Sequence, residues 1–544
     1  MMMNNTRIFL VLMLMTAFTS ASAQTLMERV RTLTDKQCYL AGERLCVRVD
    51  VLMGEPSSDG SWVPSPSRVA YLELSDAQQM VTQAMVSLTD GQGWAEIPLP
   101  VRMHSGCYQL TAYTRNMRNF GPEVFSRSVI GVINGEQLSR RDNVRFVPDS
   151  LLVEEADQSA LSLAQLSRVA PMGEVTLTLP EASSQGCAIT VEQNGLLTNV
   201  PYLQLSNGMQ LPVSSPETLT YAPELEGHIV TAQLAVDNVT DLLNSRLALV
   251  GKSASIYDGQ QQSDGSYLYY TSGVYGNLPT LVSAYDYKGH AVPMQLISPY
   301  AQSLPKSLPE LRVCCTEAQL LSRASAARRQ AVVNDWLHTD TLQHSLGFMS
   351  ATPRYFYDLD EYTHMSSIRE LIVEFVRGVK RQKEGGVNML FTVDPETHSY
   401  SRWPALVLLD GMPVYDIDEI LEYDAHLVKY VQIYTGRFTF GQTCCQGVIS
   451  FVTRGGRLSN YKLDAGSHLV SYAFPQDHPH YAAHSTACPP SGCPHSTLLW
   501  EPAARGLSYT FRAPAAPGRY QVTIQCYQAD GSPLCQRYEF EVGY

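Results

Sequence analysis

The chain has 544 residues, more than one hydrophobic core organises, so several domains are expected. Hydrophobic residues make up 44% of it, and 30 Tyr and 31 Pro accompany only 17% charged residues, a balance that favours strands and turns. The net charge of −13, without a long basic run, argues against nucleic acid as a partner, because phosphate contacts need clustered Lys and Arg.

The first 23 residues have the layout of a secretory signal peptide. A short polar start leads to an apolar run over residues 8–18 and a small-x-small sequence, Ala-Ser-Ala, at 21–23. The apolar run is about half of the ~20 residues that a membrane-spanning helix needs, so an anchor is the weaker alternative. Cleavage would leave Gln24 first, and Cys38 lies too far along for lipid attachment. We therefore expect export to the periplasm or the outer membrane, without a transmembrane segment in the mature chain.

The chain contains 12 Cys, and all of them follow the predicted signal. In an oxidising compartment such cysteines are expected to form disulfides. Cys526 and Cys535 flank Asp-Gly at 530–531 symmetrically, and Asp-Gly between strand-like runs predicts a two-residue hairpin turn. Counting outward from that turn places the two Cys opposite each other, ~4.5 Å apart between Cα atoms, so we predict a disulfide. Cys38 and Cys46 flank a second turn in a similar way, and buried free thiols are the alternative.

The N-terminal part combines a short polar motif with alternating strands. Thr-Asp-Lys at 34–36 and Tyr-Leu-Ala-Gly-Glu at 39–43 precede a run over 45–51 that alternates apolar and polar residues, as a half-buried strand does. A second alternating run continues into Arg-Asn-Met-Arg-Asn-Phe over 105–120. The segment resembles the second macroglobulin-type domain of α2-macroglobulins, and exported Bacteroidota proteins that carry such a domain. The resemblance spans roughly residues 25–135 and implies a β-sandwich.

Protease-trapping macroglobulins carry a thioester in a Cys-Gly-Glu-Gln motif. The nearest match in this chain is Asn-Gly-Glu-Gln at 134–137, which lacks the thiol. Covalent trapping through this motif is therefore excluded. A thioester-less relative that interacts with proteases stays open, and residues 251–266 would then be its exposed, cleavable bait loop.

Short alternating runs continue through the middle of the chain. Runs over 174–179, 188–192 and 229–234 are separated by turn residues, and further turns follow at 264–265 and 288–289. This spacing predicts two more β-sandwich units of Ig-like type.

Two helices are predicted after residue 309. A capping box at 316–319 precedes a stretch rich in Ala and Arg that extends to Trp336. Ser367 with Glu370 caps a second helix, in which apolar residues spaced at three and four positions over 368–379 form one face. We expect that face to pack on a sheet.

The segment after these helices alternates strands with Gly-containing turns. An apolar strand at 405–409 runs into Asp-Gly-Met-Pro-Val at 410–414, and a short helix at 418–423 leads to a strand at 427–434. Phe-Gly and then Gly-Val-Ile-Ser-Phe-Val-Thr, ending at 453, follow. This order resembles the plug domain of TonB-dependent outer-membrane transporters, over about residues 365–457, and implies an α+β fold.

The chain after Gly456 is too short for the barrel of ~20 or more strands that surrounds such a plug. The resemblance therefore implies the plug fold without a pore. Reuse as a docking or recognition domain is the expectation, by analogy with the fold alone.

The last segment is expected to be β-structured. Runs over 508–512, 519–525 and 536–542 alternate, but about fifty residues make a marginal core, so we expect a disulfide staple or docking on an earlier sandwich. A Pro-rich stretch precedes it and contains residue types that bind zinc or copper, without the spacing of a structural zinc site. A small Cys488–Cys493 disulfide loop is the simpler interpretation, and no metal is assigned. The residues concerned are His478, His480, His484, Cys488, Cys493 and His495.

No nucleophile elbow, zinc-binding His-Glu-x-x-His helix, Walker loop or dinucleotide fingerprint occurs in the sequence, and no catalytic, cofactor-binding or metal-binding residue is assigned. We predict a mainly β, multidomain chain that acts as a non-enzymatic binding or scaffold protein with a protein partner in the cell envelope. A surface adhesin and the thioester-less macroglobulin relative are the alternatives.

The predicted divisions are a signal peptide at 1–23, β-sandwiches at 24–135, 136–222 and 223–305, a helical linker at 306–364, a plug-like α+β domain at 365–460, a Pro-, His- and Cys-rich loop at 461–497 and a C-terminal β segment at 498–544.

Overall fold

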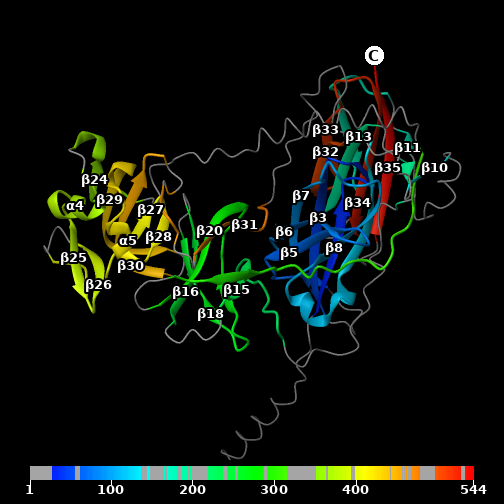
Figure 1. Cartoon of the computed structure of the whole chain (residues 1–544). Helices are drawn as coiled ribbons and strands as arrows, with labels where there is room; N and C mark the ends of the chain where they lie inside the picture. The colour runs from blue at the N-terminus through cyan, green and yellow to red at the C-terminus, as the bar shows by residue number, and fades with distance from the viewer. Residues whose placement is uncertain are drawn as a thin grey trace, which may run out of the picture. The chain divides into compact units, whose positions relative to one another are not determined.

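The computed structural model of the chain is built mainly from β-strands (Figure 1). Two short α-helices, α4 (Ile368–Glu374) and α5 (Ile417–Leu421), accompany the strands in the described part. The prediction of a mainly β, multidomain chain is confirmed. The structure describes residues 27–54, 62–135, 144–147, 164–165, 168–180, 186–193, 197–198, 200, 219–236, 242–250, 255–286, 291–314, 351–362, 365–393, 399–440, 443–455, 458, 460–463, 467–477, 497–527 and 533–543.

The chain forms two compact units, and each is assembled from separate stretches of sequence. Unit 1 comprises Met1–Leu225, Ala301–Ala331 and His478–Tyr544. Unit 2 comprises Glu226–Tyr300 and Val332–Asp477. The middle of the sequence is therefore inserted into unit 1, whose first and last stretches fold together.

The first sandwich of unit 1 packs two sheets against each other. The predicted strands at 45–51 and 105–114 lie in them as β3 and β8. One sheet has the order β1-β3-β4, with β7 also paired to β3. The other has the order β2-β9-β8-β5-β6. The strands are β1 (Met27–Thr34), β2 (Cys38–Leu40), β3 (Arg44–Gly54), β4 (Val63–Pro64), β5 (Val69–Ser75), β6 (Met80–Ser87), β7 (Gln92–Pro98), β8 (Gly106–Tyr113) and β9 (Ser126–Ile133).

Smaller elements complete this part of unit 1. Two 3-10 turns, η1 (Asn116–Phe120) and η2 (Pro122–Val124), connect β8 to β9. A three-stranded sheet covers Gly131 with the side chain of Leu311. Its strands, in order, are β10 (Val144–Phe146), β23 (Leu311–Cys314) and β14 (Leu197–Thr198).

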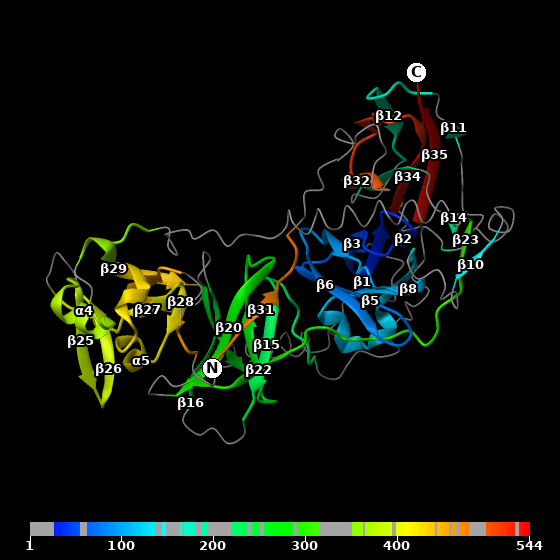
Figure 2. The ribbon, with the colours of Figure 1, turned by 45° about the horizontal axis from the view of Figure 1, so that its top comes forward.

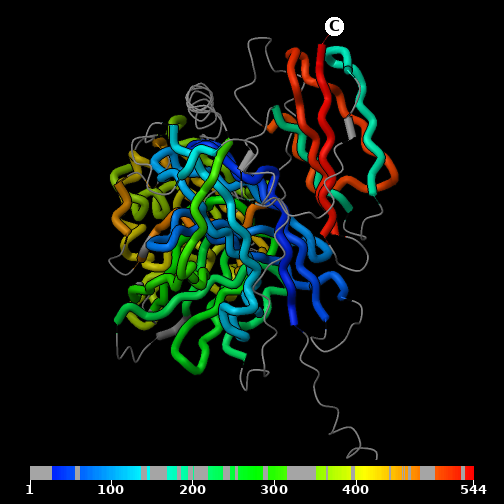
Figure 3. The backbone as a smooth tube through the Cα atoms, turned by 90° about the vertical axis from the view of Figure 1, so that its right-hand side faces the viewer, coloured from blue at the N-terminus to red at the C-terminus, as the bar shows by residue number. Residues whose placement is uncertain are grey.

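The second sandwich of unit 1 joins distant parts of the sequence. Its larger sheet has the order β11-β35-β34-β13-β32, so an early strand lies between two late ones. Figure 3 shows these early strands, in teal, beside the red C-terminal strands. The smaller sheet pairs β12 with β33. The strands are β11 (Ala164–Gln165), β12 (Glu174–Thr178), β13 (Cys187–Gln193), β32 (Thr497–Ala504), β33 (Ser508–Arg512), β34 (Gly518–Tyr527) and β35 (Pro533–Val542).

The last hairpin has a different register from the one predicted. Gln525 lies opposite Cys535, and Cys526 lies opposite Leu534, because Tyr527 pairs with Pro533 across a longer connection than a two-residue turn. A shift of one residue moves a side chain to the other face of its sheet. Cys526 and Cys535 therefore lie on opposite faces of the sheet, no disulfide links them, and the predicted disulfide between them is wrong. Cys38 and Cys46 are likewise buried, and no disulfide links one to the other.

Unit 2 contains a third sandwich. One sheet has the order β18-β19-β15-β22, and the other has the order β17-β16-β20-β21, with β31 also paired to β20. The predicted run at 229–234 is confirmed as β15. The strands are β15 (Ile229–Leu234), β16 (Leu242–Leu249), β17 (Ser255–Asp258), β18 (Gln260–Gln261), β19 (Tyr267–Tyr270), β20 (Asn277–Asp286), β21 (Ala291–Val292), β22 (Met294–Ile297) and β31 (His468–Ala473).

The proposed bait loop is not an exposed loop where the structure describes it. Residues 255–258 pair with β16, and residues 260–261 pair with β19. Ile256 and Tyr257 are buried. The expectation of a cleavable loop over 251–266 is wrong for these residues, because sheet pairing holds them.

The rest of unit 2 is an α+β part that shares a core with the third sandwich. Its main sheet has the order β24-β29-β30-β27-β28, and β25 and β26 form a separate hairpin next to α4 (Figure 2). Ala248, Ile256 and Leu281 of the third sandwich belong to the same core. The elements are β24 (Tyr355–Asp358), η3 (Leu359–Glu361), β25 (Val379–Glu384), β26 (Val387–Thr392), β27 (Leu406–Leu409), β28 (Met412–Val414), η4 (Ala425–Leu427), β29 (Val428–Phe440) and β30 (Thr443–Thr453).

The predicted helix that begins at Ile368 agrees with the structure at its start but not at its end. The Ser367 side chain accepts a hydrogen bond from the Glu370 N–H, as predicted for the cap of α4. The helix then ends at Glu374, because residues from Val379 onward pair with β26 as a strand. The helix expected at 316–336 lies outside the described residues. Within the described residues, no helix has the length and apolar content needed to cross a membrane.

Candidate functional site

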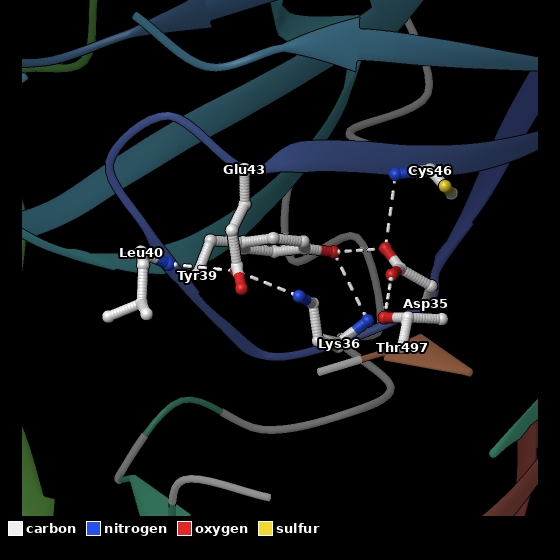
Figure 4. Close-up of polar contacts among 7 residues, drawn as sticks. All are labelled: Asp35, Lys36, Tyr39, Leu40, Glu43, Cys46 and Thr497. Atoms are coloured by element: carbon white, nitrogen blue, oxygen red, sulfur yellow. Dashed lines mark hydrogen bonds and ion pairs between the residues drawn. The ribbon is translucent and has the colours of Figure 1, made fainter. Parts of the chain in front are cut away.

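The polar motif at the start of unit 1 folds into a buried cluster (Figure 4). The Tyr39 hydroxyl donates to Asp35 Oδ1 at 2.6 Å and accepts from the Lys36 N–H at 3.1 Å. Asp35 Oδ1 also accepts from the Cys46 N–H at 3.0 Å, and Thr497 Oγ1 donates to Asp35 Oδ2 at 2.7 Å. The carboxylate of Asp35 therefore joins β1, β2 and β3 to β32, which lies at the far end of the sequence.

A second carboxylate closes the turn after Tyr39. Lys36 Nζ lies 2.8 Å from Glu43 Oε2, which also accepts from the Leu40 N–H at 2.9 Å. Lys36 Nζ lies 4.8 Å from the centre of the Tyr39 ring, a cation–π contact. The Lys36 and Glu43 side chains are only 5% and 11% exposed, so this ion pair is shielded from water.

Burial and charge act in opposite directions on these groups. Burial raises the pKa of Asp35, although Lys36 and the hydrogen bonds counteract it. Burial would lower the pKa of Lys36, but the charges of Glu43 and Asp35 outweigh it and raise that pKa. Burial also raises the pKa of Tyr39 and of the Cys46 thiol. The Cys46 thiol is therefore kept protonated. The role of the cluster is structural, because its bonds connect the first strands of unit 1 to β32.

The polar face of β3 is covered as well. Arg48 Nε donates to Asp50 Oδ1 at 3.0 Å, and Arg48 Nη1 donates to the carbonyls of Gly186 and Pro502 at 3.1 and 2.8 Å. Both side chains of the ion pair are 1% exposed. The prediction of a half-buried β3 is wrong, because the second sandwich packs on its polar face and supplies the partners that Arg48 needs.

In unit 2, the Asp-Gly-Met-Pro-Val motif also has a structural role. The Asp410 carboxylate accepts from the Thr453 N–H at 2.7 Å, from Thr453 Oγ1 at 2.6 Å and from the Leu458 N–H at 2.8 Å. One carboxylate thus connects the turn after β27 to the end of β30. The turn at 410–414 and the end of the strand at 453 therefore meet at this residue.

The described surface of unit 2 presents a group of aromatic and cationic side chains, which we call the aromatic patch. It consists of Lys380, Tyr400, Arg402 and Trp403. Tyr400 and Trp403 are 50% and 60% exposed. Lys380 Nζ lies 4.1 Å from the centre of the Tyr400 ring, and Arg402 Cζ lies 5.7 Å from that of Trp403. Large exposed aromatic rings beside cations are typical of binding surfaces.

Residues 400–403, which include three of the four residues of the aromatic patch, are held in place by hydrogen bonds. Gln446 Oε1 accepts from the N–H groups of Arg402 and Trp403 at 3.0 and 3.3 Å. Ser401 Oγ donates to the Trp403 carbonyl at 2.9 Å and accepts from the Thr392 N–H at 3.2 Å. Hydrogen bonds to Thr392 and Gln446 therefore hold the backbone next to Tyr400, Arg402 and Trp403 in place.

Sequence reasoning assigned no site residue and did not single out the aromatic patch. The available signal was Tyr-Ser-Arg-Trp at 400–403, two aromatic residues and an Arg in a polar connection where no core can bury them. The His and Cys candidates at 478–495 lie outside the described residues. In the part of the chain that is described, no three His, Cys, Asp or Glu side chains are grouped so that they could hold a metal ion.

No protein-family model and no curated protein matches this chain. Among solved structures, it is similar to Salmonella alpha-2-macroglobulin reacted with methylamine, with 10% identity over 95% of this chain and 23% of that one, at a TM-score of 0.16. Escherichia coli alpha-2-macroglobulin activated by porcine elastase matches with 10% identity over 95% of this chain and 31% of that one, at 0.17. Dimeric latent PorU from Porphyromonas gingivalis matches with 8% identity over 95% of this chain and 34% of that one, at 0.14. This chain thus spans a third or less of the macroglobulin chains, and TM-scores this low support no inference about function.

Proposed function

We propose that this chain is an exported, non-enzymatic binding or scaffold protein of the periplasm or outer membrane, and that it docks on an acidic surface of an envelope protein through the aromatic patch. Export rests on the signal-like residues 1–23. The resemblance of unit 2 to plug domains and of the N-terminal segment to macroglobulin-type domains is part of this proposal. The observation that carries it is the exposure of Tyr400 and Trp403 on a hydrogen-bonded loop.

The chemistry of the aromatic patch indicates the kind of partner. Trp, Tyr and Arg supply most of the binding energy at protein interfaces, because they bury a large area with few rotatable bonds. Tyr400 already contacts Lys380, and Trp403 lies beside Arg402, so little side-chain freedom remains to be lost on binding. The patch is cationic in a chain of net charge −13. An acidic partner is therefore attracted to this patch and repelled by the molecule as a whole, which orients the encounter.

The buried clusters support a scaffold role. The macroglobulin-like motif is used for bonds around Asp35, and the plug-like motif for bonds around Asp410. The bonds around Asp35 stabilise unit 1, and those around Asp410 stabilise unit 2, which carries the aromatic patch. The thioester-less protease-interacting alternative gains no support, because its bait loop is partly paired in sheets.

The test uses the full chain, expressed with its N-terminal segment and cross-linked in intact cells. We expect the wild type to be recovered in the envelope fraction, cross-linked to a defined envelope protein. Tyr400→Ala with Trp403→Ala should reduce that cross-linked product by about 30-fold or more, the effect of losing ~2 kcal/mol at a binding hot spot. Leu507→Ala is the matched control, since Leu507 is 80% exposed but belongs to unit 1.

Two outcomes would overturn the proposal. Equal cross-linking by the Tyr400 and Trp403 double variant and by Leu507→Ala would remove the aromatic patch from any binding role. Recovery of the wild type in the cytoplasm alone would contradict export.

A further inference from the structure

Two cysteines from distant parts of the sequence face each other in the second sandwich. β13 and β34 are antiparallel, and Ala188 lies opposite Gln525 in their register. The next position along the pair places Cys187 opposite Cys526. Residues directly opposite on antiparallel strands have Cα atoms about 4.5–5.5 Å apart, within the range of about 4.4–6.8 Å that a disulfide requires.

Both side chains point into the same core. Cys187 and Cys526 belong to the apolar cluster that also contains Ile189 and Ile524, the neighbouring pair on that face. Their exposed fractions are 1% and 0%. The neighbours Ala188 and Tyr527 point to the opposite face, where they pack with Leu33 and Cys46 of the first sandwich. The alternation of the strands thus leaves Cys187 as the thiol facing Cys526 among the described cysteines.

The two thiols are in contact. A hydrogen bond between them, together with burial, raises the pKa of Cys187. The same hydrogen bond lowers the pKa of Cys526, with Arg48 acting in the same direction. Opposite shifts of this kind arise when one thiol donates its proton toward the other sulfur.

We propose that Cys187 and Cys526 form a disulfide, made by exchange with a disulfide-bearing oxidant of an oxidising compartment. One cysteine thiolate attacks the oxidant disulfide, which forms a mixed disulfide and releases one oxidant thiol. The second cysteine thiolate then attacks the sulfur of the first, and the second oxidant thiol leaves. The two cysteines are oxidised, the oxidant is reduced by two electrons, and the two protons end on the released thiols.

The burial of both sulfurs restricts when this exchange takes place. An oxidant cannot reach a core that is closed, so the exchange occurs while β34 is joining β13. Once closed, the bond is shielded from reductants. It covalently joins the strand that precedes unit 2 in the sequence to one that follows it.

Peptide mapping of the wild-type protein gives the direct test. The reduced, unfolded chain is refolded with oxidised and reduced glutathione, blocked with an alkylating agent in denaturant, digested without reductant and measured by mass spectrometry. We expect a linked peptide that joins Cys187 to Cys526. Alkylation of both cysteines, or a link from Cys526 to any other cysteine, would overturn the proposal. Because the mapping uses the wild type and added glutathione, it depends neither on a variant that folds nor on export.

Matched variants separate this bond from its neighbour. Cys535→Ser changes the same hairpin on the other face, and the linked peptide should persist at its wild-type amount. Cys187→Ser should abolish it and leave Cys526 alkylated. We also expect reduction in denaturant followed by refolding with reductant to lower the melting temperature of the wild type and of Cys535→Ser. In a chain with Cys187→Ala and Cys526→Ala, reduction should leave the melting temperature unchanged. If reduction lowers its melting temperature as much as that of the wild type, another disulfide is the stabilising one.

Discussion

At the scale of single residues, unit 1 buries charged groups that the sequence places on a solvent-facing side of a strand. Arg48 and Asp50 alternate with valines in β3, and that pattern is typical of a half-exposed strand. The second sandwich covers them, and the carbonyls of Gly186 and Pro502 complete the hydrogen bonding of the guanidinium. A buried charge that loses its partner lowers the stability of the fold strongly. Arg48 and Asp50 therefore give the sharpest test of the packing between the two sandwiches of unit 1.

Replacing Arg48 by Met should lower the free energy of unfolding by about 3–5 kcal/mol, because Asp50 then stays buried without its counter-charge. Arg44→Met, in the same strand, removes the ion pair with Glu96, whose side chains are 33% and 19% exposed. That change should cost about 1 kcal/mol or less, since a pair near the surface is screened by water. Urea unfolding of both variants at neutral pH measures the difference, and equal losses would contradict the buried role of Arg48.

The polar cluster gives a prediction about pH. Because burial raises the pKa of Asp35 in the folded state, the folded chain retains that proton at pH values where the unfolded chain has lost it. The favourable contribution of Asp35 is thus complete below about pH 4, where an unfolded Asp ionises, and is lost as the pH rises through the higher folded pKa. Asp35→Asn removes this titration and keeps an oxygen that accepts from Tyr39 and Cys46.

We therefore expect the stability of Asp35→Asn, relative to the wild type, to increase with pH across that window and to level off above it. Urea midpoints measured over a series of pH values give the comparison. Asp264→Asn in unit 2 is the control, because hydrogen bonds from Ser266 lower the pKa of Asp264, and its difference from the wild type should not rise with pH. A difference for Asp35→Asn that stays constant with pH would show that its carboxyl titrates alike in both states.

At the scale of elements, local patterns predicted several strands and helix starts but not how they end. β15 occupies the predicted residues because alternation and Val/Ile content are local properties. α4 begins at its predicted cap but stops at Glu374, since pairing with β26 outweighs the helical spacing of the residues that follow. The register of β34 and β35 was missed because it depends on a connection longer than the Asp-Gly turn suggested.

Gly447, in β30, tests the packing between elements. It has a φ of 88°, and a Cβ added there would collide with the side chain of Thr392, which is buried in β26. Gly436, in the neighbouring β29, has a φ of 113°, but an added Cβ meets nothing within 4 Å. Gly436→Ala should therefore cost only the backbone strain, about 1–3 kcal/mol.

Gly447→Ala should cost clearly more than Gly436→Ala, because the strain is combined with a displaced Thr392. Thermal unfolding of both variants measures the gap. If Thr392→Ala in the Gly447→Ala background fails to recover part of the loss, the collision is not the cause.

At the scale of the whole molecule, unit 1 is discontinuous in sequence, and this could not be predicted from local patterns. β13 pairs with β32 and β34 although all of unit 2 lies between them in the chain. Long-range pairing leaves no periodicity in either segment. The sequence did indicate that the last strands were too few to be stable alone, and docking on an earlier sandwich was one of the two outcomes expected.

Trp500, in β32, should couple the two sandwiches of unit 1. It is 3% exposed and packs with Leu33, Cys46 and Ala188. Trp500→Ala should destabilise unit 1 by about 3–5 kcal/mol, and amide hydrogen exchange should accelerate in β3, which lies more than four hundred positions earlier. Leu507→Ala should change the stability by about 0.5 kcal/mol or less. Unchanged amide exchange in β3 after Trp500→Ala would mean that the stability of the first sandwich does not depend on its packing against the second.

The insertion of unit 2 also determines the order in which a ribosome can complete this molecule. Synthesis at ~5–20 residues per second takes roughly 15–60 s to add the ~300 residues between Gln193 and Thr497. During that interval β13 has been made, but both of its neighbours in the sheet are missing. Its unpaired edges are then open to other nascent chains, and such edges promote aggregation. Yield should therefore depend on chaperones that hold the early strands until the C-terminal strands arrive, and on expression slow enough to keep the concentration of unfinished chains low.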